Sequence, residues 1–164
     1  LEQLVREHQL QDHVQLRGED TDQRLVQCYQ QCDLFALPNR EINGDIEGFG
    51  IVLLEAQACG LPVLAGDSGG TAETMRTAGE RGSGGAGEQG SRGAGEQGSR
   101  GEGETGVIVN CETPEPLAAA VLELLGDPQR CQQMGRSGRA WVEERFSWDK
   151  LSQEAEKVFG GGRR

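Results

Sequence analysis

Two glutamates, Glu47 and Glu55, flank a short glycine-rich turn in the sequence E-G-F-G-I-V-L-L-E. Gly48 and Gly50 let the backbone approach a ligand closely, because neither residue carries a Cβ atom. If a helix begins at Gly50, its free amides and positive dipole end favour an anion such as a phosphate. Glu55 then lies roughly 7.5 Å further along the axis, about the separation of a nucleotide's diphosphate from its ribose. Because carboxylates accept hydrogen bonds from hydroxyl groups, the pattern favours a sugar–diphosphate–ribose ligand.

The apolar run after Gly50 predicts a helix over residues 50–59. Gly60 and Pro62 end it, since glycine is common just past a helix end and proline cannot continue a helix. Apolar residues cover nearly the whole circumference, so we expect this helix to be buried on most sides. A buried carboxylate is costly unless a polar group meets it. Glu55 therefore predicts a ligand or, as the alternative, a structural ion pair with an arginine.

Strand and helix patterns alternate along the chain, which predicts an α/β fold: a Rossmann-like parallel sheet with helices on both faces. The expected strands cover residues 13–17, 33–37, 61–65 and 106–110. The expected helices cover residues 1–9, 21–32, 50–59, 71–75, 114–125, 128–145 and 148–159, with Trp141 and Trp148 in the core. Ligands of such sheets bind beyond the carboxyl ends of the strands. We therefore expect the loops at 38–50 and 66–71 to share one site.

The segment E-G-F-G-I-V-L-L-E-A, with its E-x7-E motif, resembles the signature of the retaining glycosyltransferases of family 4, which have the GT-B fold. The loop A-G-D-S-G-G-T-A-E and the closing R-F-S-W-D-K-L are similar to segments of that family. The longer L-P-N-R-E-I-N-G-D-I is most similar to the branch that includes GDP-mannose-dependent mannosyltransferases of the phosphatidylinositol-mannoside type. The resemblance covers residues 14–159 with one interruption. It implies transfer of a hexose from a nucleotide sugar, GDP-mannose or a UDP-hexose, with retained configuration and no cofactor or obligatory metal.

The resemblance also implies roles for individual residues. Glu47 would contact the transferred sugar and is the predicted catalytic residue, and Glu55 would hold the ribose hydroxyls of the donor. The other expected donor-binding residues are Gly48, Phe49, Gly50 and Ile51 near the diphosphate and sugar, Gly18 with Arg17 near the base, and Ser68 and Gly69, in the stretch 68–71, at the sugar.

A glycine-rich octapeptide is repeated nearly three times between Ala78 and Gly101. Deleting residues 81–104 removes 24 residues, which is three octads, and joins Glu80 to Thr105 in a family-like sequence. The insert lacks apolar residues that could offset the entropy of ordering, so we expect it to be disordered. Its G-x-G-x-x-G matches have no strand before them and no helix after them, and thus indicate no dinucleotide site. The expected division is a partial nucleotide-sugar-binding domain formed by 1–77 and 105–160, the insert 78–104, and a tail 161–164.

The amino-acid composition limits the classes of partner and the location that we expect for the protein. The formal net charge of −11 argues against nucleic acid, for which a basic surface is expected. Five cysteines without C-x-x-C spacing predict reduced thiols, a cytoplasmic location and no metal site. No apolar run approaches the roughly 18 residues of a transmembrane helix, so membrane association of a full-length protein would be peripheral.

The chain starts inside a helical pattern at Leu1, and we expect it to be a piece of something longer. The resemblance makes it the C-terminal half of a GT-B fold, without the N-terminal acceptor domain or the basic pair expected against the diphosphate. Three classes stay open: the donor-binding part of a glycosyltransferase that works with the missing domain, a stand-alone nucleotide-sugar binding module, and an inactive fragment. Enzyme activity of these residues alone is therefore left open, as is the acceptor, a lipid or a saccharide.

Overall fold

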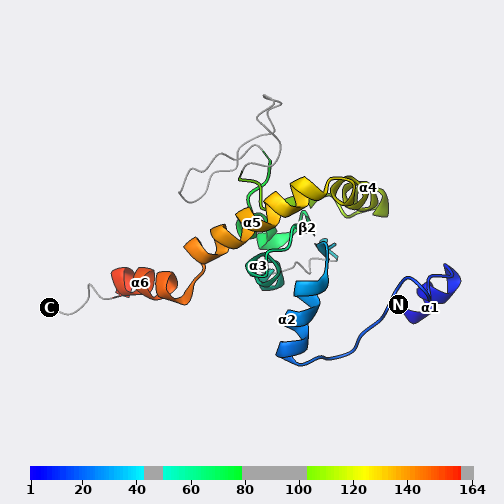
Figure 1. Cartoon of the computed structure of the whole chain (residues 1–164), viewed down its shortest axis with the longest axis horizontal. Helices are drawn as coiled ribbons and strands as arrows, with labels where there is room; N and C mark the ends of the chain where they lie inside the picture. The colour runs from blue at the N-terminus through cyan, green and yellow to red at the C-terminus, as the bar shows by residue number, and fades with distance from the viewer. Residues whose placement is uncertain (43–49, 79–102, 160–164) are drawn as a thin grey trace.

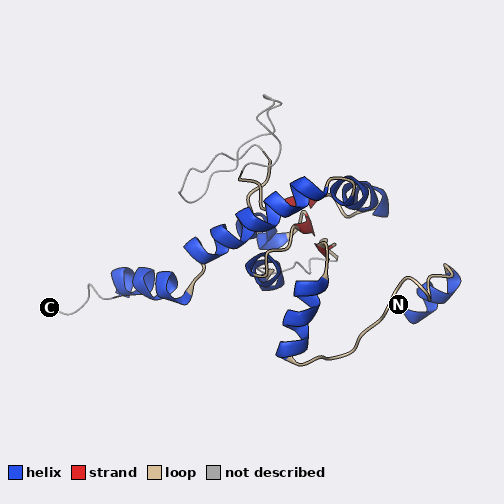
Figure 2. Cartoon of the chain, viewed as in Figure 1, coloured by secondary structure: helices blue, strands red, loops and turns tan. Residues whose placement is uncertain are grey.

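The computed structural model of the chain describes residues 1–42, 50–78 and 103–159. Its sheet consists of three parallel strands, in the order β1 (Phe35–Leu37), β2 (Val63–Gly66) and β3 (Gly106–Val109) (Figure 2). β2 lies in the middle and is buried along its whole length. The apolar run that predicted a strand covered on both faces is thereby confirmed.

Helices precede and follow the strands, as the sequence pattern predicts. They are α1 (Glu2–Glu7), α2 (Asp22–Gln31), α3 (Ile51–Ala58), the 3-10 helix η1 (Gly69–Thr74), α4 (Pro114–Leu125), α5 (Pro128–Arg145) and α6 (Trp148–Phe159) (Figure 1). Side chains cap two of them, which satisfies backbone amides that have no partner inside the helix. The hydroxyl of Thr21 accepts from the Arg24 amide at 3.4 Å, and the carboxylate of Asp127 accepts from the Arg130 amide at 3.0 Å.

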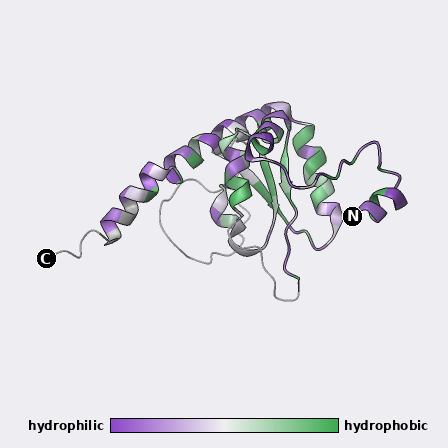
Figure 3. Cartoon of the chain, turned by 90° about the horizontal axis from the view of Figure 1, so that it is seen from below, coloured by the Kyte–Doolittle hydropathy of each residue, from purple (hydrophilic) through white to green (hydrophobic). Residues whose placement is uncertain are grey.

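Alternate residues of β2 point into two separate layers. On one face, Val63 and Ala65 belong to a core shared with α2 and α3. On the other face, Leu64 packs with Leu124 of α4 and Met134 of α5. Figure 3 shows the apolar strands enclosed between helices. The predicted parallel α/β sheet with helices on both faces is confirmed.

Helix α5 also packs against α3 through glycines. A Cβ atom added to Gly135 would stand 2.0 Å from the carbonyl oxygen of Gly60, in the turn that ends α3. Three residues later, a Cβ added to Gly138 would lie 3.1 Å from the side chain of Gln57. The backbone of α5 therefore touches the turn that ends α3, which fixes the position of α3 against α5.

The strand predicted over residues 13–17 is wrong. Residues 14–20 are exposed and form no helix or strand. The described sheet ends at β1, so no neighbouring strand supplies hydrogen-bond partners for this segment. Arg17 instead forms an ion pair with Asp20 at 3.0 Å and a contact with the Cys28 sulfur at 3.5 Å.

Two expectations about burial are also wrong. Helix α3 is not buried on most sides, because the sheet and α5 cover only the side that carries Leu53 and Ala56, whereas Ile51 is 63% exposed. Trp148 is 86% exposed and thus lies outside the core. Helix α6, which begins with this residue, extends away from the sheet beyond the end of α5 (Figure 1). Trp141, in contrast, is buried as predicted.

The two ends of the glycine-rich insert are tied together. The Thr105 amide donates to the carbonyl of Arg76 at 2.8 Å, and the Arg76 amide donates to the Thr105 hydroxyl at 2.8 Å. Glu104, which the sequence analysis placed in the insert, is buried and bonded to Arg130, so it belongs to the folded part. Residues 79–102, and with them the predicted disorder, lie outside the described residues.

Deleting residues 81–104 is expected to leave the melting temperature within a few degrees. The stem at Arg76 and Thr105 closes the loop whatever its length, and closure entropy grows only logarithmically with length. The deletion also leaves a glutamate, Glu80, directly before Thr105. Thermal unfolding of the shortened and full-length chains measures the difference. Loss of a cooperative transition in the shortened chain would show that the insert is part of the fold.

Candidate functional site

The loops that follow the three strands meet at one edge of the sheet. The Asp67 amide, just after β2, donates to the carbonyl of Val109 at the end of β3, at 3.0 Å. Arg40, after β1, donates from Nη1 to the carbonyl of Glu112, after β3, at 3.3 Å. This is the carboxyl edge, where ligands of parallel α/β sheets bind.

Helix α3 begins at this edge with an open amino end. Gly50 is its N-cap and has a left-handed backbone, with φ of 67°, which a residue with a side chain rarely adopts. Within the described part of the chain, no side chain caps this end, and the first turn of α3 holds no acidic residue. Free amides and the positive end of the helix dipole are therefore available for an anion. Gly50 and the exposed Ile51 thus lie at the carboxyl edge of the sheet, and their contacts with the donor stay predictions.

Glu55 lies one turn further along α3, on the same exposed side as Ile51. Its Oε2 accepts a hydrogen bond from the hydroxyl of Tyr29 at 3.2 Å. Within the described part of the chain, no arginine forms an ion pair with Glu55, so the alternative of a structural ion pair has no support there. Tyr29 is only 6% exposed. Burial, followed by the nearby Glu55 carboxylate, raises the pKa of Tyr29 to about 12, and the phenol therefore stays protonated as a donor to Glu55.

The loop after β2, residues 66–71, forms the second wall of the site, and the amino end of α3 with Glu55 forms the first. Gly69 has a left-handed backbone, with φ of 60°, and begins η1. The hydroxyl of Thr71 donates to the carbonyl of Ser68 at 2.6 Å, and the Thr74 hydroxyl donates to the carbonyl of Thr71 at 2.7 Å. The Ser68 hydroxyl is buried and has no hydrogen-bond partner among the described residues. The loop is therefore held by its own side chains and retains one unused donor.

Asn39 is a site residue that the sequence analysis did not single out. Its side chain links the loop after β1 to the loop after β2: Oδ1 accepts from the Gly66 amide at 2.9 Å, and Nδ2 donates to the Ser68 carbonyl at 3.1 Å. Its position directly after the strand-ending Pro38 was the only signal available in the sequence.

The remaining predicted site residues are not brought to this edge by the described structure. Glu47, Gly48 and Phe49 lie outside the described residues, so their predicted roles stay predictions. Gly18 lies in the exposed segment before α2, and a Cβ atom added there would meet nothing within 4 Å. Among residues 1–42, 50–78 and 103–159, three or more metal-binding side chains nowhere gather into a cluster, and none of the helices has the length and apolar character needed to span a bilayer.

Comparison with known proteins agrees with this geometry. The family model described as "Glycosyl transferases group 1" matches residues 1–85. A GDP-mannose-dependent monoacylated alpha-(1-6)-phosphatidylinositol monomannoside mannosyltransferase of Corynebacterium glutamicum is 34% identical over 148 residues, 89% of this chain and 32% of the relative. The GDP-mannose-dependent alpha-(1-6)-phosphatidylinositol monomannoside mannosyltransferase of Mycobacterium tuberculosis is 34% identical over 93% of this chain and 34% of its own length. The chain thus spans about a third of the curated relatives that it matches.

Solved structures share the fold. Sucrose-phosphate synthase from Thermosynechococcus elongatus superimposes with a TM-score of 0.70 and 26% identity, over 98% of this chain and 34% of that one. The Anabaena protein HepE, solved in complex with UDP, gives a TM-score of 0.72 at 21% identity, over 98% of this chain and 35% of that one. Both are much longer chains, of which this chain matches about a third. Since the family model covers more than half of the residues, the chain belongs to the group 1 glycosyl transferases, and its sheet is part of a GT-B fold.

Proposed function

We propose that this chain is the donor-binding part of a retaining glycosyltransferase. The observation that carries the proposal is the exposed side of α3, where Glu55 stands one turn beyond an open helix amino end and is met only by the Tyr29 hydroxyl among the described residues. The diphosphate of the donor binds at the first amides of α3, and Glu55 accepts from the ribose hydroxyls. The sugar lies toward the loop at 66–71, and Glu47 contacts its hydroxyls.

GDP-mannose is the donor that the relatives favour. Two relatives that are 34% identical to this chain are named as GDP-mannose-dependent mannosyltransferases. The chain covers only about a third of each relative, so in this proposal the acceptor, a lipid or a saccharide, is bound by residues beyond the match. The site uses no cofactor in this proposal. A UDP-hexose is the second candidate donor, because a protein of the same fold was solved with UDP.

The chain alone is expected to bind a donor weakly and to transfer no sugar. Its net charge of −11 repels an anionic ligand at long range. A charge-assisted hydrogen bond contributes about 1.5–3 kcal/mol, so two basic contacts supplied from outside these residues would account for roughly two to four decades of affinity. Titration of GDP, UDP, ADP and GDP-mannose followed by NMR is the test. Shifts confined to residues 50–55 and 66–71, with GDP and GDP-mannose binding most tightly, are the expected result.

Glu55→Gln is the variant that tests the ribose contact. Glutamine keeps an oxygen that accepts from Tyr29, so the melting temperature should hold, whereas the loss of the carboxylate should weaken nucleotide binding roughly tenfold to hundredfold. Glu143→Gln is the matched control, because it removes one charge from an exposed pair on α5. Marked destabilisation by Glu55→Gln would favour a structural role for this residue.

The same titration separates the competing classes. A complete absence of shifts at millimolar nucleotide would favour an inactive fragment. Micromolar affinity, or sugar transfer by these residues alone, would favour a stand-alone module or enzyme. Weak binding that becomes tight when the part of a mannosyltransferase relative outside the match is added in trans would support the proposal.

A further inference from the structure

Asn39 uses its whole side chain to hold the neighbouring loop. Oδ1 accepts from the Gly66 amide at 2.9 Å, and Nδ2 donates both to the Ser68 carbonyl at 3.1 Å and to the Thr71 hydroxyl at 2.8 Å. An asparagine amide offers two donor hydrogens and one acceptor oxygen, and here all of them have partners. A single side chain after β1 therefore fixes the last residue of β2 and two residues of the loop that follows it.

The surrounding packing makes this link stiff. The backbone of Asn39 lies against Gly66 so closely that a Cβ atom added there would stand 1.7 Å from the Asn39 carbonyl oxygen. Thr71, which is almost fully buried, accepts from Asn39 and donates in turn to the Ser68 carbonyl at 2.6 Å. With the Thr71 amide, which donates at 3.4 Å, the Ser68 carbonyl thus receives three hydrogen bonds, and the backbone of the loop has little freedom to move relative to Asn39.

The side chain of Asn39 bonds to the loop at 66–71 and, among the described residues, to no part of α3. Its contacts all lie in the loop at 66–71, whereas the open amides of α3 and Glu55 are held by α3 itself, by α5 and by Tyr29. Resting on the proposed function, this division assigns the nucleotide to one wall and the sugar to the other. We propose that Asn39 is the positioning residue for the sugar end of the site: it sets the loop at 66–71 for the transferred sugar and leaves nucleotide binding unaffected.

Asn39→Asp tests this inference with little change in shape. Aspartate keeps the acceptor for the Gly66 amide but loses both donors and sets a carboxylate oxygen against the Ser68 carbonyl. NMR titrations with GDP and with GDP-mannose give two dissociation constants for each protein. We expect the variant to bind GDP-mannose about tenfold more weakly and GDP within about twofold of wild type, since only the sugar contact is lost.

Asn110→Asp is the matched control for charge. Asn110 lies at the same edge and its Oδ1 accepts from the Glu112 amide at 2.8 Å, so aspartate adds the same charge while keeping that bond. If Asn39→Asp does not fold, Thr71→Val removes one partner of Asn39, and Thr71→Ser restores its hydroxyl. The valine variant should then show the selective loss for GDP-mannose, and the serine variant should not.

The outcomes separate the two proposals. Equal weakening of GDP and GDP-mannose in Asn39→Asp, or no weakening of either, would overturn the role of Asn39 while leaving the nucleotide site intact. A wild-type chain that binds neither ligand at millimolar concentration would instead contradict the proposed function and, with it, this inference. A selective loss for GDP-mannose that the Asn110 control does not show supports both.

Discussion

Gly135→Ala is expected to lower the free energy of unfolding by about 1–3 kcal/mol or more, although alanine normally favours a helix over glycine. The added Cβ atom would stand 2.0 Å from the Gly60 carbonyl oxygen and 2.9 Å from its carbon. Both are backbone atoms, so no side chain can move aside to relieve the overlap. Helix α5 must instead shift away from the turn that ends α3, which loosens the packing of Met134 of α5 against Leu64 and Leu124. Urea denaturation of the variant and of wild type measures the change.

Gly138→Ala is the matched comparison, one turn later on the same helix. Its Cβ atom would meet the side chain of Gln57 at 3.1 Å, and a side chain can adjust by a few tenths of an ångström. We expect a much smaller effect there, within about 1 kcal/mol of wild type, because helix propensity offsets the crowding. Equal effects of the two substitutions would show that backbone contact between α3 and α5 is not the cause.

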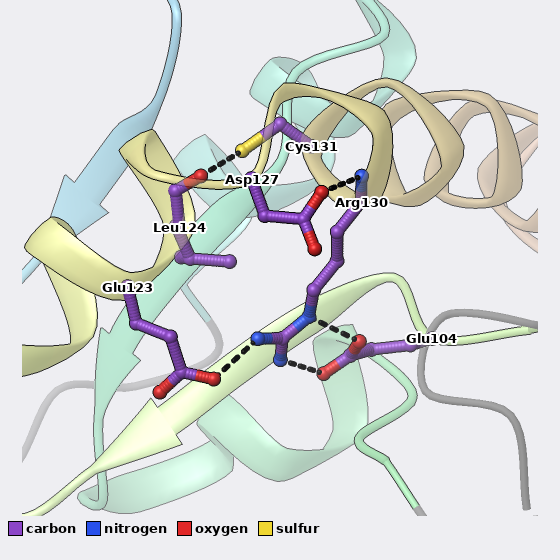
Figure 4. A network of polar contacts seen from close by, with 6 residues as sticks. All are labelled: Glu104, Glu123, Leu124, Asp127, Arg130 and Cys131. Atoms are coloured by element: carbon purple, nitrogen blue, oxygen red, sulfur yellow. Dashed lines mark hydrogen bonds and ion pairs between the residues drawn. The ribbon is translucent and has the colours of Figure 1, made fainter.

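Arg130→Met is expected to cost about 3–5 kcal/mol, because it leaves a buried carboxylate without its partner. Two nitrogens of Arg130 donate hydrogen bonds to the carboxylate of Glu104 (Figure 4): Nε to Oε2 at 3.1 Å, and Nη2 to Oε1 at 2.9 Å. The third nitrogen reaches Glu123 at 2.7 Å. Glu104 is only 3% exposed, so solvent cannot replace the arginine.

A double-mutant cycle separates the pair from its surroundings. The Arg130→Met, Glu104→Met double variant removes both charges, and apolar replacement of a buried pair is often close to neutral. It should therefore recover most of the stability that Arg130→Met loses. Glu123→Gln should cost less than about 1 kcal/mol, because that carboxylate is largely exposed. A single Arg130→Met variant as stable as wild type would contradict the importance of this pair.

The parts of the fold that could be predicted from the sequence are those set by local pattern. Helices α3, α4 and α5 and the buried strand β2 show their apolar pattern, and the glycine or proline that bounds it, within a few residues. The strand expected at 13–17 failed because a strand also needs a neighbour, and local alternation does not report whether one is present. The prediction that Trp148 lies in the core failed for a similar reason, because its helix is apolar on one side but extends beyond the layers that could cover it.

The predictions about the site divide in the same way, into those set by local pattern and those that depend on distant contacts. Glycine and carboxylate spacing was enough to place Gly50 and Glu55, since both depend on where α3 begins. Counting apolar residues around that helix could not show which side the sheet and α5 would leave open. Asn39 bonds to residues 27 to 32 positions later in the chain, and such contacts follow only from the parallel pairing of β1 with β2.

The junction at Glu104, where the glycine-rich insert meets the folded part, has a consequence for how the length of the chain can vary. Glutamate occupies the same place in every octad, at Glu80, Glu88, Glu96 and Glu104, and each is followed two residues later by glycine. Loss of one, two or three whole units up to Glu104 therefore always brings a glutamate next to Thr105, and duplication of a unit does the same. Arg130 keeps a partner at every such length. Repeats of this kind expand and contract in whole units, and here each step of eight residues would reproduce the same junction with the folded domain. A deletion that removes Glu104 without bringing another glutamate next to Thr105 would instead leave Arg130 without a partner at that position.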